Sequence, residues 1–210
     1  MPLVIAGATS GSTTVQATDA VTATITLPSA TTTLVGATTP SFTTTIGVGN
    51  ATPSTSGAGI TFPATQSAST NANTLDDYEE GTWTPGADDA GGNSFTAGVA
   101  VGRYVKVGNV VTANCYFTWT SKGSVNAGPM AISGLPFASN NTSNFSQAAV
   151  IGLASGFDTV VGTVQLAANN LANSTRINLL QITDNAGFNY LPANSCSNTG
   201  EISVSISYIV

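Results

Sequence analysis

Residues 103–120 read RYVKVGNVVTANCYFTWT, and this stretch decides the fold. Gly108-Asn109 is a two-residue turn of the kind that joins antiparallel strands. In the second strand apolar side chains occupy every second position, namely Val111, Ala113, Cys115, Phe117 and Trp119. Because side chains alternate between the two faces of a strand, the pattern predicts one face in a core and one in water.

The same alternation recurs further along the chain. At residues 202–208, Ile202, Val204, Ile206 and Tyr208 alternate with serines. Residues 148–153, 159–166 and 175–182 add β-prone stretches, and their spacing is typical of an all-β sandwich or barrel. We therefore predict an all-β fold in which residues 86–210 form an antiparallel, jelly-roll-like β-sandwich with almost no helix.

Residues 1–75 differ in composition from the rest of the chain, since they are rich in Thr and Ala and carry a single charged residue, Asp19. Within residues 21–27 apolar residues alternate with threonines, and Pro28 ends the pattern. Such a segment is either a disordered linker or an arm that becomes ordered by laying its apolar side chains on another chain. The regular alternation favours an extended assembly arm, because a solvated linker does not need it.

Charge and composition exclude several functions. Four Lys+Arg against ten Asp+Glu give a net charge of −6, which argues against nucleic acid as a partner. The chain has no histidine, so Ser-His-Asp and Cys-His catalysis and His-ligated zinc are excluded, and we expect no enzyme activity and no cofactor. No apolar run is long enough to span a membrane, and the start does not resemble a secretory signal. Folding in a reducing cytoplasm favours two free, buried thiols at Cys115 and Cys196 over the alternative of a disulfide between them.

An acidic and aromatic cluster fills residues 76–85, with Asp88 and Asp89 close behind. Two carboxylates flanking a cleft are the requirement of a glycosidase, and several converging oxygen ligands are that of a calcium site. The spacing selects neither, so the favoured interpretation is a solvated junction between arm and domain, with no catalytic or metal-binding residue. Trp83 and Trp119 are candidates for stacking on sugar, although a core role is favoured for Trp119 and an edge-anchor role for Trp83.

Two motifs carry a resemblance to a known family. Residues 60–69, ITFPATQSAS, and residues 75–85, LDDYEEGTWTP, resemble a signature of tail-fibre and virion surface proteins of tailed bacteriophages. The resemblance continues at residues 102–111 and 132–137, whereas the Thr-rich opening is similar only in composition. It implies a β-rich, trimeric, externally displayed structural protein without enzyme activity.

The sequence holds an arm and one globular unit but no shaft, and this favours one kind of virion protein. We expect a homotrimeric capsid decoration protein, of the cement or head-fibre type, assembled in the host cytoplasm with its arm lying across the major capsid protein. The alternative is a short tail-fibre adhesin that binds host surface polysaccharide. Such an adhesin needs exposed aromatics, for which Trp83, Phe188 and Tyr190 are the candidates.

Overall fold

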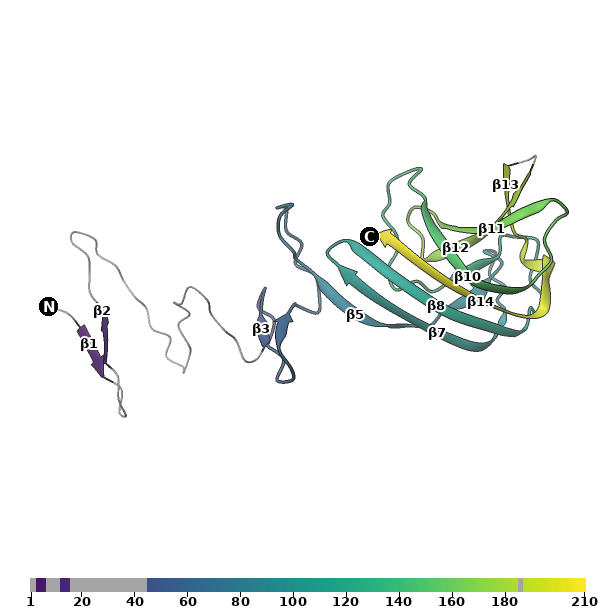
Figure 1. Cartoon of the computed structure of the whole chain (residues 1–210). Coiled ribbons are helices and arrows are strands. Elements are labelled where there is room, and N and C mark those ends of the chain that lie inside the picture. The colour runs from purple at the N-terminus through teal and green to yellow at the C-terminus, as the bar shows by residue number, and fades with distance from the viewer. Residues whose placement is uncertain (1–2, 7–11, 16–44, 185–186) are drawn as a thin grey trace. The chain divides into compact units, whose positions relative to one another are not determined.

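The computed structural model describes residues 3–6, 12–15, 45–184 and 187–210 (Figure 1). The chain divides into two units, Met1–Phe42 and Thr43–Val210. In the first unit, β1 (Leu3–Ala6) pairs antiparallel with β2 (Ser12–Val15). The alternating stretch 21–27, predicted to be part of the arm, lies outside the described residues.

The second unit consists of strands, and one short 3₁₀ helix, η1, is the only helix in the described part of the chain. The strands are β3 (Thr45–Gly47), β4 (Gly59–Thr61), β5 (Tyr78–Trp83), β6 (Gly86–Asp88), β7 (Thr96–Val107), β8 (Val110–Ser121), β9 (Ala131–Ser133), β10 (Gln147–Phe157), β11 (Thr163–Asn170), β12 (Arg176–Thr183), β13 (Gly187–Tyr190) and β14 (Cys196–Ile209), and η1 covers Ala193–Ser195. The predicted all-β antiparallel class is confirmed.

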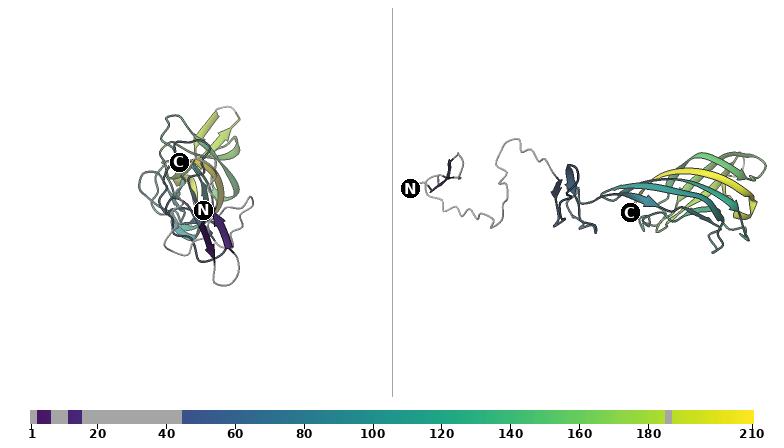
Figure 2. Two further views of the ribbon diagram at one scale, coloured as in Figure 1. Left: turned by 90° about the vertical axis from the view of Figure 1, so that its left-hand side faces the viewer. Right: turned by 90° about the horizontal axis from the view of Figure 1, so that it is seen from below.

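Ten of these strands form one continuous sheet in the order β5-β7-β8-β14-β10-β11-β12-β9-β6, with β13 added beside β12. In place of the two separate sheets of a jelly roll, these strands form one sheet that curls (Figures 1 and 2). The long strands β7, β8, β14 and β10 lie side by side across its middle. Strands β3 and β4 form a separate parallel pair ahead of the sheet.

The hairpin predicted at residues 103–120 is confirmed. Val107 and Val110 are paired across the turn, and Gly108 has φ +56°, a conformation that favours glycine. The next strand, β14, pairs with β8 so that its own apolar positions continue the same buried face, with Ile202 opposite Phe117.

The core lies inside the curl of the sheet. Trp119 and Phe117 of β8 and Tyr208 of β14 are almost fully buried, as are Met130, Ile132, Ile177 and Leu179 from the opposite end of the sheet. Phe95 meets the Trp119 ring edge-on at 5.5 Å, and the Trp119 indole N–H donates to the Ser197 carbonyl at 3.0 Å. The predicted core role of Trp119 is confirmed.

The structure corrects the expected junction at residues 76–85. Residues 78–83 are the edge strand β5, paired in register with β7 from Tyr78↔Val107 to Trp83↔Gly102, so the sheet begins before residue 86. The strand was missed because glutamate and glycine, not apolar residues, occupy most of its inward positions.

Both cysteines are buried, free thiols, in agreement with the sequence-based prediction. Burial raises the pKa of Cys115 to about 11 and the pKa of Cys196 to about 12. Within the ranges that the structure describes, no helix is long and apolar enough to cross a membrane.

Candidate functional site

The acidic cluster does not form one site, because its side chains are distributed over both faces of β5 and the loops beside it. Asp77 forms a buried ion pair with Lys106, whose ammonium also donates to the Gln66 side-chain oxygen at 3.1 Å. Asp76 accepts a 2.7 Å hydrogen bond from the Ser69 backbone N–H, which lowers the pKa of its carboxyl.

Asp88 and Asp89, expected in a solvated turn, are instead 6 % and 1 % exposed. Arg176 reaches Asp88 at 3.2 Å. Asp89 accepts the backbone N–H groups of Gly91, Asn93 and Asn126, together with the Asn93 side-chain amide. The Asn126 N–H and the Asn93 amide, which favour the ionised form, hold the pKa of Asp89 well below its usual value.

The two glutamates of β5 are also engaged. The Tyr104 hydroxyl donates to Glu79, and this hydrogen bond raises the pKa of Tyr104 to about 12. The Tyr78 hydroxyl donates to Glu80 at 3.1 Å. Each of the six carboxylates therefore has a partner within the chain, and no cluster of three or more potential metal ligands occurs among the residues described.

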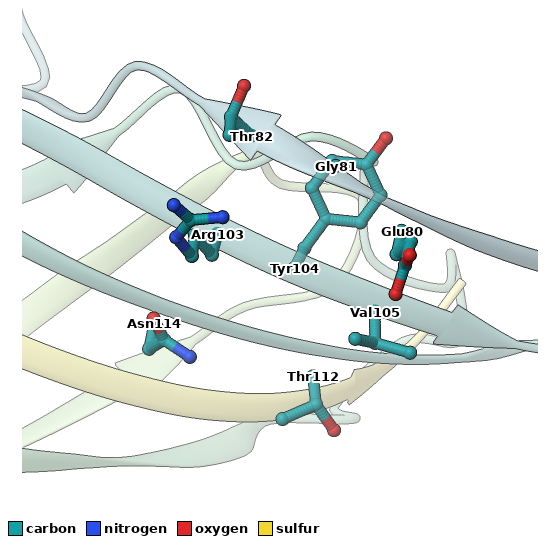
Figure 3. Close-up of a pocket in the computed structure, with 8 residues that line it drawn as sticks. All are labelled: Glu80, Gly81, Thr82, Arg103, Tyr104, Val105, Thr112 and Asn114. Carbon is teal, nitrogen blue, oxygen red and sulfur yellow. The ribbon is translucent and has the colours of Figure 1, made fainter.

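A shallow trough of about 480 Å³ lies over the outer face of β5, β7 and β8 (Figure 3). One row across the strands holds Thr82, Arg103 and Asn114, and the next holds Glu80, Val105 and Thr112. The register alone brings these side chains together, because residues opposite each other on neighbouring strands point to the same face. We call this surface the Arg103 trough.

A second hollow, of about 550 Å³, is walled by exposed aromatic rings. It is lined by Asn144, Phe145, Ser146, Asn169, Leu171, Ala172, Phe188 and Tyr190. Phe188 is 60 % exposed and Phe145 41 %, although most aromatic side chains in the described part of the chain are buried or half-buried. We call this surface the aromatic hollow.

Polar groups are built into the aromatic hollow. The Asn169 amide donates to the Ser146 hydroxyl at 3.0 Å, and Phe188 meets Tyr190 edge-on with ring centroids 6.1 Å apart. Concave, mostly apolar sites with a few fixed polar groups are typical of small-molecule binding. Aromatic faces next to amides and hydroxyls suit a ligand with apolar C–H faces and hydroxyl edges, which is the chemistry of a sugar.

The sequence identified part of this hollow. Phe188 and Tyr190 lie together in it, whereas Trp83 is 8 % exposed and its indole N–H donates to the Arg103 carbonyl at 3.3 Å. Sequence reasoning missed Phe145 and Arg103. The available signal for Phe145 was that it is the one aromatic residue in the polar stretch 138–147. The available signal for Arg103 was that it alternates with inward positions of its strand, as Val101 and Val105 do, and so points outward.

Comparison with known proteins places the fold. No protein-family model and no curated protein matches the chain. Among solved structures, the chain is similar to the Dettilon tailspike protein (gp208), with a TM-score of 0.53 and 21 % identity. The curled sheet is similar to part of a tailspike.

That similarity covers 63 % of this chain but only 24 % of the tailspike, so the chain spans about a quarter of the length of that protein. At this level of identity the likeness concerns the fold. The residues that line the two hollows are therefore interpreted from their own chemistry.

Proposed function

We propose that the chain is a non-enzymatic structural protein on the exterior of a tailed-phage virion, and that it belongs to a homotrimeric tail fibre or tailspike that attaches to host surface polysaccharide. The observation that carries the proposal is the aromatic hollow on a fold similar to part of a tailspike. Exposed aromatic rings are costly in water, and their concentration around one hollow favours a ligand that stacks on them.

Binding of the fluorescent full-length protein to host cells tests the attachment role. We expect Phe188→Ala and Phe145→Ala each to weaken binding roughly tenfold, since exposed aromatic anchors carry much of a binding energy. Tyr116→Ala is the matched control, because Tyr116 is 37 % exposed but does not line the hollow. Equal binding by all three variants would reject the hollow as the attachment site.

The absence of catalysis is part of the proposal. It is supported by the partners of the six clustered carboxylates, since a glycosidase needs two carboxylates that flank a bound sugar. Release of reducing sugar from host polysaccharide by the wild-type protein, lost in Glu80→Gln, would overturn this part.

Capsid decoration, the function favoured from the sequence, is the second candidate here, and residues 1–75 favour it. An arm with Asp19 as its single charged residue is suited to adding strands to exposed sheet edges through main-chain hydrogen bonds. Such an arm would make many weak contacts to neighbouring subunits, above all to the major capsid protein. Because these contacts form simultaneously, the overall affinity exceeds that of any single contact.

Copy number per virion separates the two candidates. A handful to a few tens of copies fits a tail fibre, and hundreds fit decoration. If the chain decorates capsids, deletion of residues 1–40 should abolish incorporation into heads, and truncated protein that still coats heads would refute the arm mechanism.

A further inference from the structure

Arg103 differs from the other basic side chains, because it has no side-chain partner among the described residues. The structure describes all four Lys and Arg residues of the chain. Lys106 is paired with Asp77 and Arg176 with Asp88, and Lys122 donates to the carbonyls of Asn194 and Cys196. Among the described residues, one guanidinium is thus exposed without a side-chain partner, on the outer face of β7 next to the edge strand β5.

The surroundings of Arg103 give the trough two different ends. Thr82 and Asn114 flank the guanidinium on the neighbouring strands, in the same cross-strand row (Figure 3). Two residues further along the strands, about 7 Å away, Glu80 and Thr112 flank Val105. One end therefore donates to an anion, and the other accepts from hydroxyls through Glu80 beside the apolar side chain of Val105.

We propose that the Arg103 trough binds a carboxylate-bearing sugar, a hexuronate unit within an acidic polysaccharide. The planar guanidinium matches a carboxylate through two parallel hydrogen bonds, and Asn114 and Thr82 offer further donors beside it. The Glu80 carboxylate accepts hydroxyl protons of the ring, and Val105 packs against its C–H face. The proposal rests on the saccharide attachment proposed above, but it concerns a second surface and an anionic ligand.

The charges of the trough favour an acidic sugar over an acidic peptide. A sugar brings one carboxylate per ring and hydroxyl donors for Glu80. A peptide with consecutive acidic side chains brings a second negative charge toward Glu80 and toward a chain of net charge −6. Arg103, the one Lys or Arg side chain without a side-chain partner in the described ranges, is matched by one carboxylate at a time.

Calorimetric titration of the full-length protein at low ionic strength tests the site. The probes are trigalacturonate and triglucuronate, with maltotriose as the neutral sugar and hexaglutamate as the acidic peptide. We expect both uronates to bind and Arg103→Gln to weaken them at least tenfold, since it removes charge-assisted hydrogen bonds. Arg103→Lys should give an intermediate loss, because it keeps the charge without the planar fork. Ser205→Ala is the matched control, since Ser205 is exposed in the same row, directly beyond Asn114, and does not line the trough.

Three outcomes would overturn the proposal: no binding of either uronate, uronate binding that Arg103→Gln leaves unchanged, or equal Arg103-dependent binding of hexaglutamate. The Phe188→Ala experiment on host cells reports separately on the attachment role. Loss of binding in Phe188→Ala together with Arg103-independent uronate binding rejects the trough alone, whereas the reverse pattern rejects the aromatic hollow alone.

Discussion

Asp89 shows how one carboxylate organises two loops. Its two oxygens accept four hydrogen bonds, from the loop that follows β6 and from Asn126 in the loop before β9. These donors favour the ionised form, so the side chain stabilises the fold as an anion.

We predict that Asp89→Asn destabilises the protein more at pH 7 than at pH 2. The pKa of Asp89 is lower in the folded state than its ordinary value of 3.8. Its stabilising effect is therefore complete above that ordinary value and declines as the pH falls toward the folded-state pKa. Urea denaturation midpoints at both pH values measure the difference. Asp158→Asn, at an exposed site, is the control, and an equal effect of Asp89→Asn at both pH values would contradict the prediction.

Lys106 and Asp77 form a buried ion pair, with side chains 5 % and 6 % exposed. Lys106→Met leaves the Asp77 carboxylate buried without its cation, so we expect a loss of about 3–5 kcal/mol in the free energy of unfolding. The double variant Lys106→Met, Asp77→Leu removes both charges and should recover most of that loss. Chemical denaturation of the wild type, both single variants and the double variant forms the test, and additive losses would show that the two side chains act independently.

At the scale of strands, aromatic residues lie opposite glycines. Trp83 is paired with Gly102, Tyr104 with Gly81, and Trp119 of β8 with Gly200 of β14. A Cβ added to Gly102 would lie 2.5 Å from the Trp83 indole nitrogen, and one added to Gly81 would lie 2.8 Å from the Tyr104 hydroxyl. Each large ring therefore covers a glycine on the neighbouring strand, which packs the ring and shields the backbone.

We predict that Gly200→Ala destabilises the domain by about 1–3 kcal/mol, the usual cost of an added methyl group in a filled core. Its Cβ would collide with the Trp119 ring and lie 2.5 Å from the Ser155 carbonyl oxygen, neither of which is free to move. Gly152→Ala is the control, because its nearest atom is the Ser203 hydroxyl oxygen at 3.0 Å, which can rotate away. The urea denaturation midpoints of both variants measure the change in stability. A Gly200→Ala protein as stable as the wild type would refute the packing argument.

The strands that could be predicted are those in which apolar residues reveal the period of two. Strands β8 and β14 are of this kind, since every inward position near their centres is apolar. Strand β5 is not, because Glu79 and Gly81 occupy inward positions where their partners on β7 supply the bulk. The pairing of these small or polar residues of β5 with large residues of β7 becomes visible only once the register of the two strands is known, and a single sequence does not give that register.

The candidate sites could be predicted even less well than the strands. The Arg103 trough depends on the pairing of three strands, and the aromatic hollow joins residues 144–146 to residues 169–172 and 188–190. Phe188 and Tyr190 were identified only as candidates for the exposed aromatics that an adhesin needs. Phe145 and Asn169 come together through the pairing of β10 with β11, in which Gln147 lies opposite Asn170.

At the scale of the whole molecule, we predict a trimer with a protease-sensitive arm. Light scattering of the isolated protein should show three copies of the 21.0 kDa chain. Residues 1–75 contain no Lys or Arg, so trypsin cannot cleave within them, and proteinase K is the suitable probe. We expect it to remove the arm first, because such a segment becomes ordered only when its apolar side chains find partners on other chains. A monodisperse monomer with a resistant arm would contradict both statements.

Because β14 lies between β8 and β10 but is the last strand to be synthesised, the middle of the sheet cannot be completed until translation is almost finished. About 75 residues separate the end of β8 from the start of β14, which corresponds to roughly 4–15 s of synthesis. Strand β8 is complete throughout that interval and β10 (Gln147–Phe157) in its later part, and each then presents an unpaired edge of backbone N–H and C=O groups. Nascent chains on adjacent ribosomes are therefore exposed to pairing with one another before their own β14 emerges.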